Sequence, residues 1–175
     1  MTDHGVVTEP GTVRIQRILP GPIERVWAFL TESEQRGRWL AAGPMEPRVG
    51  GAVALHFRND ELSDGERAPE KYRDSECRQA QVDGRVIAWE PPRRLAYSWG
   101  GGSEVTFELT PEAAGVRLVL THRRLPDREQ MLGVSAGWHA HLDILIARLE
   151  GVPAKPFWPN HTRLEAEYDR LLPAA

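Results

Sequence analysis

The sequence predicts an α+β domain, in which helices pack on one face of an antiparallel sheet. Several short segments alternate apolar and polar residues, as half-buried strands do. A long segment without proline near the C-terminus repeats its apolar residues at helical spacing instead. The 175 residues, 41% of them hydrophobic, suffice for one core, so we expect no second folded domain.

The N-terminal part predicts one strand and two short helices. Residues 1–10 are polar and unpatterned, and we expect a loose, flexible end. Alternation over Thr12–Leu19 predicts the first strand. After a Pro-Gly-Pro break, apolar residues in 23–30 follow the i, i+3, i+4, i+7 spacing of an amphipathic helix. A second short helix is expected over 33–40, with Ser33 as its cap.

The middle of the chain predicts a meander of antiparallel strands. Residues 53–57 alternate with period two, which predicts a strand. The charged, unpatterned residues 59–76 predict an exposed loop that is long enough to form a lid or a rim. Further strands are expected over residues 78–89, 94–99, 103–109 and 116–122, the first of them broken at Asp83-Gly84. A curved sheet of such strands that grips a helix leaves room for a pocket.

The C-terminal part predicts two helices. Arg128–Glu150 carries one apolar face and must lie on the sheet. The residues Thr162-Arg163-Leu164-Glu165 form a capping-box pattern, which predicts a closing helix over 162–172. We therefore divide the chain into a flexible N-terminus (1–10), a domain (11–152), and a proline-rich link with a C-terminal helix (153–175). That helix is too short to be stable alone and is expected to dock on the domain or on a dimer partner.

A series of short sequence words occurs in a characteristic order. They are Ile23-Glu24-Arg25-Val26-Trp27, Leu30-Thr31, Val49-Gly50-Gly51, Gly84-Arg85-Val86, Glu90-Pro91-Pro92-Arg93-Arg94-Leu95-Ala96-Tyr97-Ser98-Trp99, Val105-Thr106-Phe107-Glu108-Leu109 and Gly137-Trp138. This order resembles the START-related (SRPBCC, polyketide cyclase-like) superfamily, and within it the branch of the activator of heat-shock protein 90 ATPase. The resemblance implies a helix-grip fold, with a curved antiparallel sheet wrapped around the long helix. It also implies a cavity for a small hydrophobic molecule.

Aromatic and apolar residues at inward positions are the candidates for lining that cavity. Six tryptophans are more than core filling normally needs in a domain of this size. Trp138 lies on the inward stripe of the long helix, beside Gly137, whose missing side chain should let the sheet approach closely. The predicted ligand-binding residues are Trp39, Leu55, Phe57, Tyr97, Trp99, Phe107, Leu120, Trp138, His141 and Leu142.

Three side chains could carry acid–base chemistry if a reaction occurs. His122 ends a strand in phase with inward leucines, His141 lies one turn beyond Gly137, and Tyr97 could complete a pair. We expect no metal, because His139 and His141 point about 200° apart around a helix. The chain contains no motif for a phosphate-bearing cofactor, and its single cysteine, Cys77, lacks a recognisable base. We therefore expect no cofactor.

Composition narrows the class of partner. A net charge of −3 gives little basis for binding nucleic acid. No apolar run is long enough for a membrane span, and the N-terminus does not read as a signal peptide, so a cytoplasmic protein is expected. Three functions stay open: a non-catalytic protein that binds a small hydrophobic or aromatic ligand, a cyclase- or hydrolase-type enzyme, and a homodimeric or chaperone-associated interaction module. We favour the first, so the expected partner is a small hydrophobic molecule.

Overall fold

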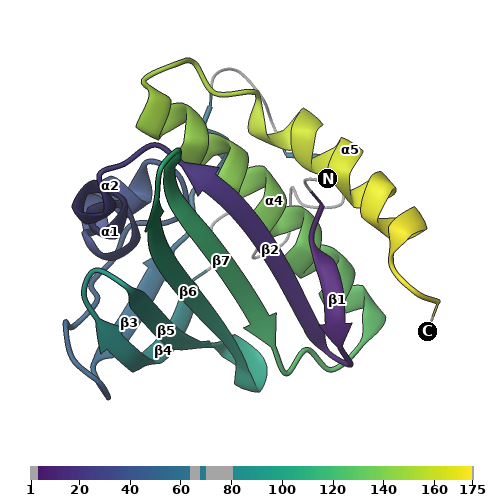
Figure 1. The fold of residues 1–175 in the computed structure, drawn as a ribbon. Helices are drawn as coiled ribbons and strands as arrows, with labels where there is room; N and C mark the ends of the chain where they lie inside the picture. Colours follow the sequence, from purple (N-terminus) through teal and green to yellow (C-terminus); the bar gives the residue numbers. More distant parts are fainter. Residues whose placement is uncertain (1–3, 64–67, 70–80, 175) are drawn as a thin grey trace.

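The computed structural model describes residues 4–63, 68–69 and 81–174. Within them, seven antiparallel strands form one curved sheet in the order β1-β2-β7-β6-β5-β4-β3 (Figure 1). The strands are β1 (Val6–Glu9), β2 (Thr12–Leu19), β3 (Ala52–His56), β4 (Gln81–Glu90), β5 (Arg94–Trp99), β6 (Ser103–Glu112) and β7 (Gly115–Arg123). The helices are α1 (Ile23–Thr31), α2 (Ser33–Gly37), α4 (Arg128–Glu150) and α5 (Phe157–Leu171), with 3-10 turns η1 (Asn59–Glu61) and η3 (Gly100–Gly102).

Helix α4 lies across the concave side of the sheet, and Figure 1 shows α5 on the side of α4 away from the long strands. Trp138, Leu142, Leu145 and Leu149 recur at about one residue per turn on α4 and are buried in one core with the inward residues of the strands. The α+β class and the helix-grip arrangement are therefore confirmed. The bounds of α4 also agree with the prediction, since Asp127 caps its first turn and Gly151 ends it in the left-handed conformation.

The expectation of a loose N-terminus is wrong at β1, which pairs with β2 along one edge of the sheet. Two contacts with α5 fix the residues just before it. The Gly5 amide donates to the Tyr168 hydroxyl at 2.6 Å, and His4 Nε2 lies 2.7 Å from a Glu167 carboxylate oxygen. The polar N-terminal sequence therefore gains its order from a helix that lies more than 150 residues away in the chain.

Helix α5 begins at Phe157, so the predicted start at Thr162 and its capping box are wrong. Pro156 is the N-cap, and Pro159 falls in the first turn, where the missing amide has no partner to lose. Leu164 and Tyr168 are buried, and Asn160 Nδ2 donates to Asp143 Oδ2 of α4 at 2.8 Å. The C-terminal helix thus packs on α4 of its own chain.

Three local predictions differ from the structure elsewhere. The N-cap position of α2 is Glu32 rather than Ser33, without a side-chain capping hydrogen bond, and the helix ends at Gly37. Strand β4 continues through Gly84, because a Cβ there would lie 2.0 Å from the Ser98 carbonyl oxygen and only glycine permits the two strands to come so close. The supposedly exposed segment 59–76 buries Leu62 and Ala68 in the core. Residues 64–67 and 70–77, which include Cys77, fall outside the described residues.

Candidate ligand-binding cavity

A cavity of about 250 Å³ lies between the ends of β3, β4 and β5 and the first half of α4. Its lining residues are Leu40, Phe57, Asn59, Val82, Trp99, Gly133, Val134, Gly137, Trp138 and His141. None of these side chains is an acid, a lysine or an arginine. The cavity therefore offers an apolar, uncharged interior with a small number of polar atoms, which is the usual composition of a small-molecule site.

Aromatic rings form the walls of the cavity. The rings of Trp99 and Trp138 have their centroids 5.2 Å apart, and the Phe57 ring meets Trp99 edge-on at 5.8 Å. Such edge-to-face and tilted contacts hold aromatic side chains in fixed orientations. The rings therefore offer flat apolar surfaces on the cavity wall.

Two glycines of α4 create the opening on the helix side. A Cβ built on Gly133 or on Gly137 would meet no atom within 4 Å. The expected close approach of the sheet at Gly137 is therefore wrong, because the missing side chain leaves space rather than contact. Glycine destabilises a helix interior by about 1 kcal/mol relative to alanine, so these two residues are unfavourable for α4 itself. The space that they leave open forms part of the cavity.

Beneath the aromatic wall, His122 is held by two hydrogen bonds. The Trp138 indole donates from Nε1 to His122 Nδ1 at 2.9 Å, and His122 Nε2 lies 2.9 Å from Ser103 Oγ. Because an indole can only donate, Nδ1 is the acceptor and Nε2 carries the proton. Burial lowers the pKa of His122 to about 4, so the ring is neutral at pH 7. Both nitrogens are committed, which leaves no lone pair to accept a proton from a ligand.

His141 has a different environment on the cavity wall. Its Nδ1 lies 2.9 Å from the Trp39 carbonyl oxygen, and since a carbonyl only accepts, Nδ1 carries the proton. Burial lowers the pKa of His141 to about 4, with the Trp39 hydrogen bond opposing that shift. The imidazole is therefore neutral at pH 7, with Nε2 as an acceptor.

Asn59 was not among the predicted site residues, although it begins η1 at the rim of the cavity. Its Oδ1 is buried and makes no hydrogen bond in the described chain. The neighbouring residues hold this turn in place, since Trp158 Nε1 donates to Asp60 Oδ1 at 2.7 Å and Arg148 donates to the Leu62 carbonyl at 2.8 Å. Asn59 is thus a fixed polar group, and sequence periodicity gave no sign of it because it lies in a turn.

The structure separates the predicted ligand-binding residues into two groups. Phe57, Trp99, Trp138 and His141 line the cavity. The others are buried in the surrounding core and do not line it: Trp39, Leu55, Tyr97, Phe107, Leu120 and Leu142. Tyr97 lies behind Trp99, with ring centroids 6.2 Å apart, and burial raises its pKa above the ordinary tyrosine value. The cavity residues that the sequence did not suggest are Leu40, Asn59, Val82, Gly133, Val134 and Gly137.

Comparison with known proteins decides the family. Residues 20–150 match the model of the family described as activator of Hsp90 ATPase homolog 1-like protein. The chain belongs to this family. The match covers every strand except β1 and β2, and it includes the cavity and all of α4. Among curated proteins, none matches the chain.

Solved structures of similar proteins have the same fold. A Bordetella parapertussis protein encoded by gene BPP1335 is 42% identical, with a TM-score of 0.82 over 99% of this chain and 92% of that one. A protein from Rhodobacter sphaeroides is 27% identical, with a TM-score of 0.59 over 83% of this chain and 97% of that one. CalU16 from Micromonospora echinospora, 24% identical, shares the fold alone, with a TM-score of 0.66 over 91% and 84% of the two chains.

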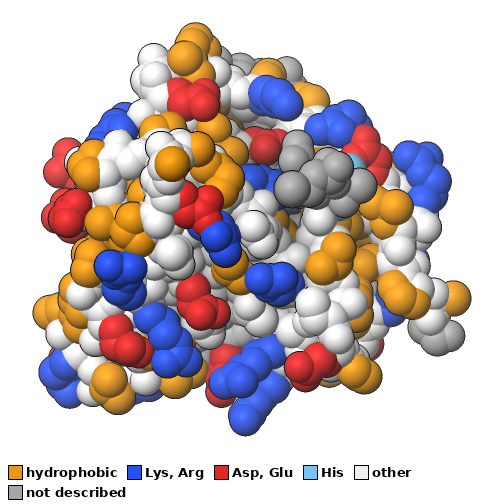
Figure 2. All heavy atoms as spheres, in the orientation of Figure 1, with side chains coloured by type: hydrophobic (Ala, Val, Ile, Leu, Met, Phe, Trp, Pro, Cys, Tyr) orange, Lys and Arg blue, Asp and Glu red, His pale blue; other side chains and the backbone are white. Residues whose placement is uncertain are grey.

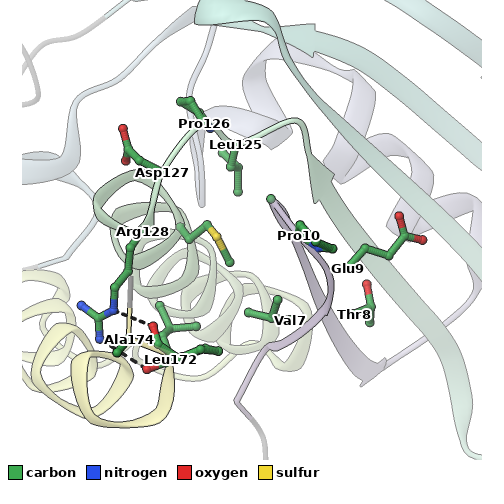
Figure 3. A pocket seen from close by; sticks show the side chains of 13 residues that line it. Val7, Thr8, Glu9, Pro10, Leu125, Pro126, Asp127, Arg128, Leu172 and Ala174 are labelled. Atoms are coloured by element: carbon green, nitrogen blue, oxygen red, sulfur yellow. Dashed lines mark hydrogen bonds between the residues drawn. The ribbon is translucent and has the colours of Figure 1, made fainter.

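A second hollow in this family member lies between β1 and the start of α4. It has a volume of about 630 Å³ and is formed by β1, the loop before α4 and the C-terminal residues (Figure 3). Val7, Leu125 and Leu172 supply apolar surface, and the Arg128 guanidinium donates to the carbonyls of Leu172 and Pro173 at 3.4 and 2.8 Å. Although it is larger, it lacks the aromatic walls of the smaller cavity. Its one cation is already bound to the chain end.

The remaining chemical features of the described chain are unspecialised. Among the described residues, no cluster of three or more His, Cys, Asp or Glu side chains could hold a metal ion. No helix in the same residues is long and apolar enough to cross a membrane. On the face shown in Figure 2, acidic and basic side chains alternate, and neither sign forms a continuous patch.

Proposed function

We propose that this protein binds a small, mainly apolar aromatic molecule in the cavity between the sheet and α4, and that binding rather than catalysis is its function. The observation that carries the proposal is the uncharged cavity of about 250 Å³ with Phe57, Trp99 and Trp138 as its walls. Membership of a family with a helix-grip fold supports it, since that fold leaves a space between sheet and helix.

The arrangement of the three acid–base candidates favours binding over an enzymatic function. His122 uses both ring nitrogens within the protein, and Tyr97 lies behind the cavity wall. His141 alone reaches the cavity, and its pKa of about 4 makes it a weak base. These three candidates therefore do not bring a general acid and a general base together on a ligand in this cavity.

The test is direct binding of an uncharged aromatic probe. Naphthalene added to the protein should give saturable shifts of the Trp99 and Trp138 indole signals in NMR spectra. The variant Gly137→Leu places a side chain in the open space beside Trp138, and we expect it to lower the affinity for naphthalene at least tenfold.

A matched variant separates filling of the cavity from a general effect on α4. Gln130→Leu adds the same side chain at an exposed position of α4 that does not line the cavity, and it should bind naphthalene as the wild type does. Absence of saturable binding to the wild type, or equal affinity in Gly137→Leu, would contradict the proposal. Native mass spectrometry of protein purified without added probe would then identify any molecule that accompanies it.

A further inference from the structure

Two polar side chains on the cavity wall, Asn59 and His141, each carry a hydrogen-bond acceptor that the described chain does not use. Asn59 Oδ1 is buried and makes no hydrogen bond in the described chain, although the amide stands at the rim of the cavity. A buried acceptor without a partner costs about 1–3 kcal/mol, and proteins seldom retain one without a reason. A ligand that donates a hydrogen bond to Oδ1 would remove this cost.

His141 adds a second acceptor on the same wall. Its Nδ1–H is used by the Trp39 carbonyl, and no hydrogen bond within the described chain uses Nε2. Neutral imidazole with its proton on Nδ1 can only accept at Nε2. Asn59 of η1 and His141 of α4 thus each carry an acceptor that the described chain does not use.

The other lining residues define the remainder of the ligand. They are glycines or mainly apolar side chains, and none of the described side chains that line the cavity is an acid, a lysine or an arginine. An anionic or cationic ligand would lose its hydration there without gaining a counter-charge, which costs more than apolar burial returns. The indole nitrogen of Trp138 is already bonded to His122.

We infer that the cavity selects an uncharged aromatic molecule that carries an N–H or O–H donor, and that Asn59 and His141 are the residues that recognise this donor. The inference rests on the proposed function and adds the substrate class to it. A phenol, an aniline or an indole meets the requirement, whereas an ether of the same shape, or a carboxylate, does not.

Two probes of nearly the same shape test the inference. Indole carries an N–H donor, and benzofuran has an oxygen acceptor at the same ring position. One additional hydrogen bond to a buried acceptor should make the dissociation constant of indole roughly tenfold lower than that of benzofuran. Isothermal titration calorimetry measures both constants, and naphthalene is titrated alongside.

Variants then assign the preference to the two side chains. Asn59→Leu removes the amide at similar volume. His141→Asn keeps a donor near the position of Nδ1 for the Trp39 carbonyl and removes Nε2. The double variant should bind indole and benzofuran with equal affinity. A thermal melt of each variant verifies that it is folded.

The outcomes separate this inference from the proposed function. Equal binding of indole and benzofuran to the wild type, tighter binding of benzofuran, or a preference that persists in the double variant would overturn the inference. In each of those cases naphthalene binding would leave the proposed function standing. Failure of all three probes to bind would overturn both.

Discussion

Two neighbouring regions between the sheet and α4 both contain polar and aromatic side chains, but they differ in whether the hydrogen-bonding groups have partners within the described chain. In the inner region, Ser103, His122 and Trp138 satisfy one another through a chain of hydrogen bonds. At the cavity rim, Asn59 and His141 each keep an acceptor that the described chain does not use. Burial alone does not distinguish the regions, because His122 and His141 are both buried and both have a pKa of about 4.

The difference lies in which neighbours each histidine meets. Trp138 occupies the second nitrogen of His122, whereas the space opposite His141 is left empty by Gly133 and Gly137. A saturated polar cluster fixes a unique core, while an unsaturated one has a free energy to gain from a ligand. The inner region therefore contributes to stability, and recognition is the role that we propose for the rim.

The largest expected effect is a loss of stability at low pH. Both regions contribute to it in the same way, because it depends on the burial of their histidines. Burial lowers the pKa of His122, His139 and His141 to about 4, below the unfolded value near 6.5. Between these values the unfolded chain binds more protons, so the free energy of unfolding falls as the pH falls. For three such histidines, the free energy of unfolding changes with pH by at most about 4 kcal/mol per pH unit. Urea denaturation at pH 7, 6 and 5 measures it.

Single replacements sharpen this prediction. His122→Gln and His141→Asn each remove one titrating group and should each lower the slope by up to about 1.4 kcal/mol per pH unit. Below about pH 4 the same groups are protonated in both states and contribute no further slope. A free energy of unfolding that is flat from pH 7 to pH 5 would show that these imidazoles are not buried and neutral.

A smaller effect is expected for the inner region alone. Trp138 is 4% exposed and packs against Trp99 and Phe107, with ring centroids 5.2 and 5.6 Å away. Trp138→Ala should lower the free energy of unfolding by about 3–5 kcal/mol. Trp138→Phe keeps a ring but leaves His122 Nδ1 without its donor, and should cost about 1–3 kcal/mol.

Chemical denaturation of both variants at pH 7 tests this order. Equal losses for alanine and phenylalanine would mean that the hydrogen bond, rather than packing, dominates. A loss below about 1 kcal/mol for Trp138→Ala would place the indole outside the core and contradict the comparison.

Most of the fold followed from periodicity, because inward positions of strands and helices must be apolar. The bounds of β2, β5 and α4 were predicted, and each has regular alternation or a regular stripe. Strand β1 was missed because its order depends on the Tyr168 hydroxyl and on pairing with β2, which are distant in sequence. Helix α5 was placed too late because its apolar start contains Pro159, which reads as a link.

The cavity was harder to predict than the fold. Trp99 and Trp138 were found because an inward aromatic residue can be located from the phase of its element. Tyr97 and Leu120 have the correct phase but lie deeper, since the depth of a residue depends on sheet curvature. Gly133 and Gly137 define the empty space by having no side chain, and Asn59 lies in a turn, so neither feature has a periodic signature.

The smallest expected effect bears on the cavity rim, where stability and recognition should change in opposite directions. Gly137→Ala adds one methyl group to α4 in open space and removes the conformational cost of glycine in a helix. It should raise the free energy of unfolding by about 0.5–1 kcal/mol. The same methyl group narrows the cavity beside Trp138, and the affinity for naphthalene should fall two- to fivefold, or about 0.4–1 kcal/mol.

Gly133→Ala provides the comparison within the same helix. Gly133 is more exposed than Gly137, so its replacement should give a similar gain in stability with a smaller loss of affinity. Urea denaturation and calorimetric titration with naphthalene measure the two quantities on the same samples. If Gly137→Ala destabilises the protein, the space beside it is occupied by the chain itself, and the division between a saturated inner region and an open rim fails at this point.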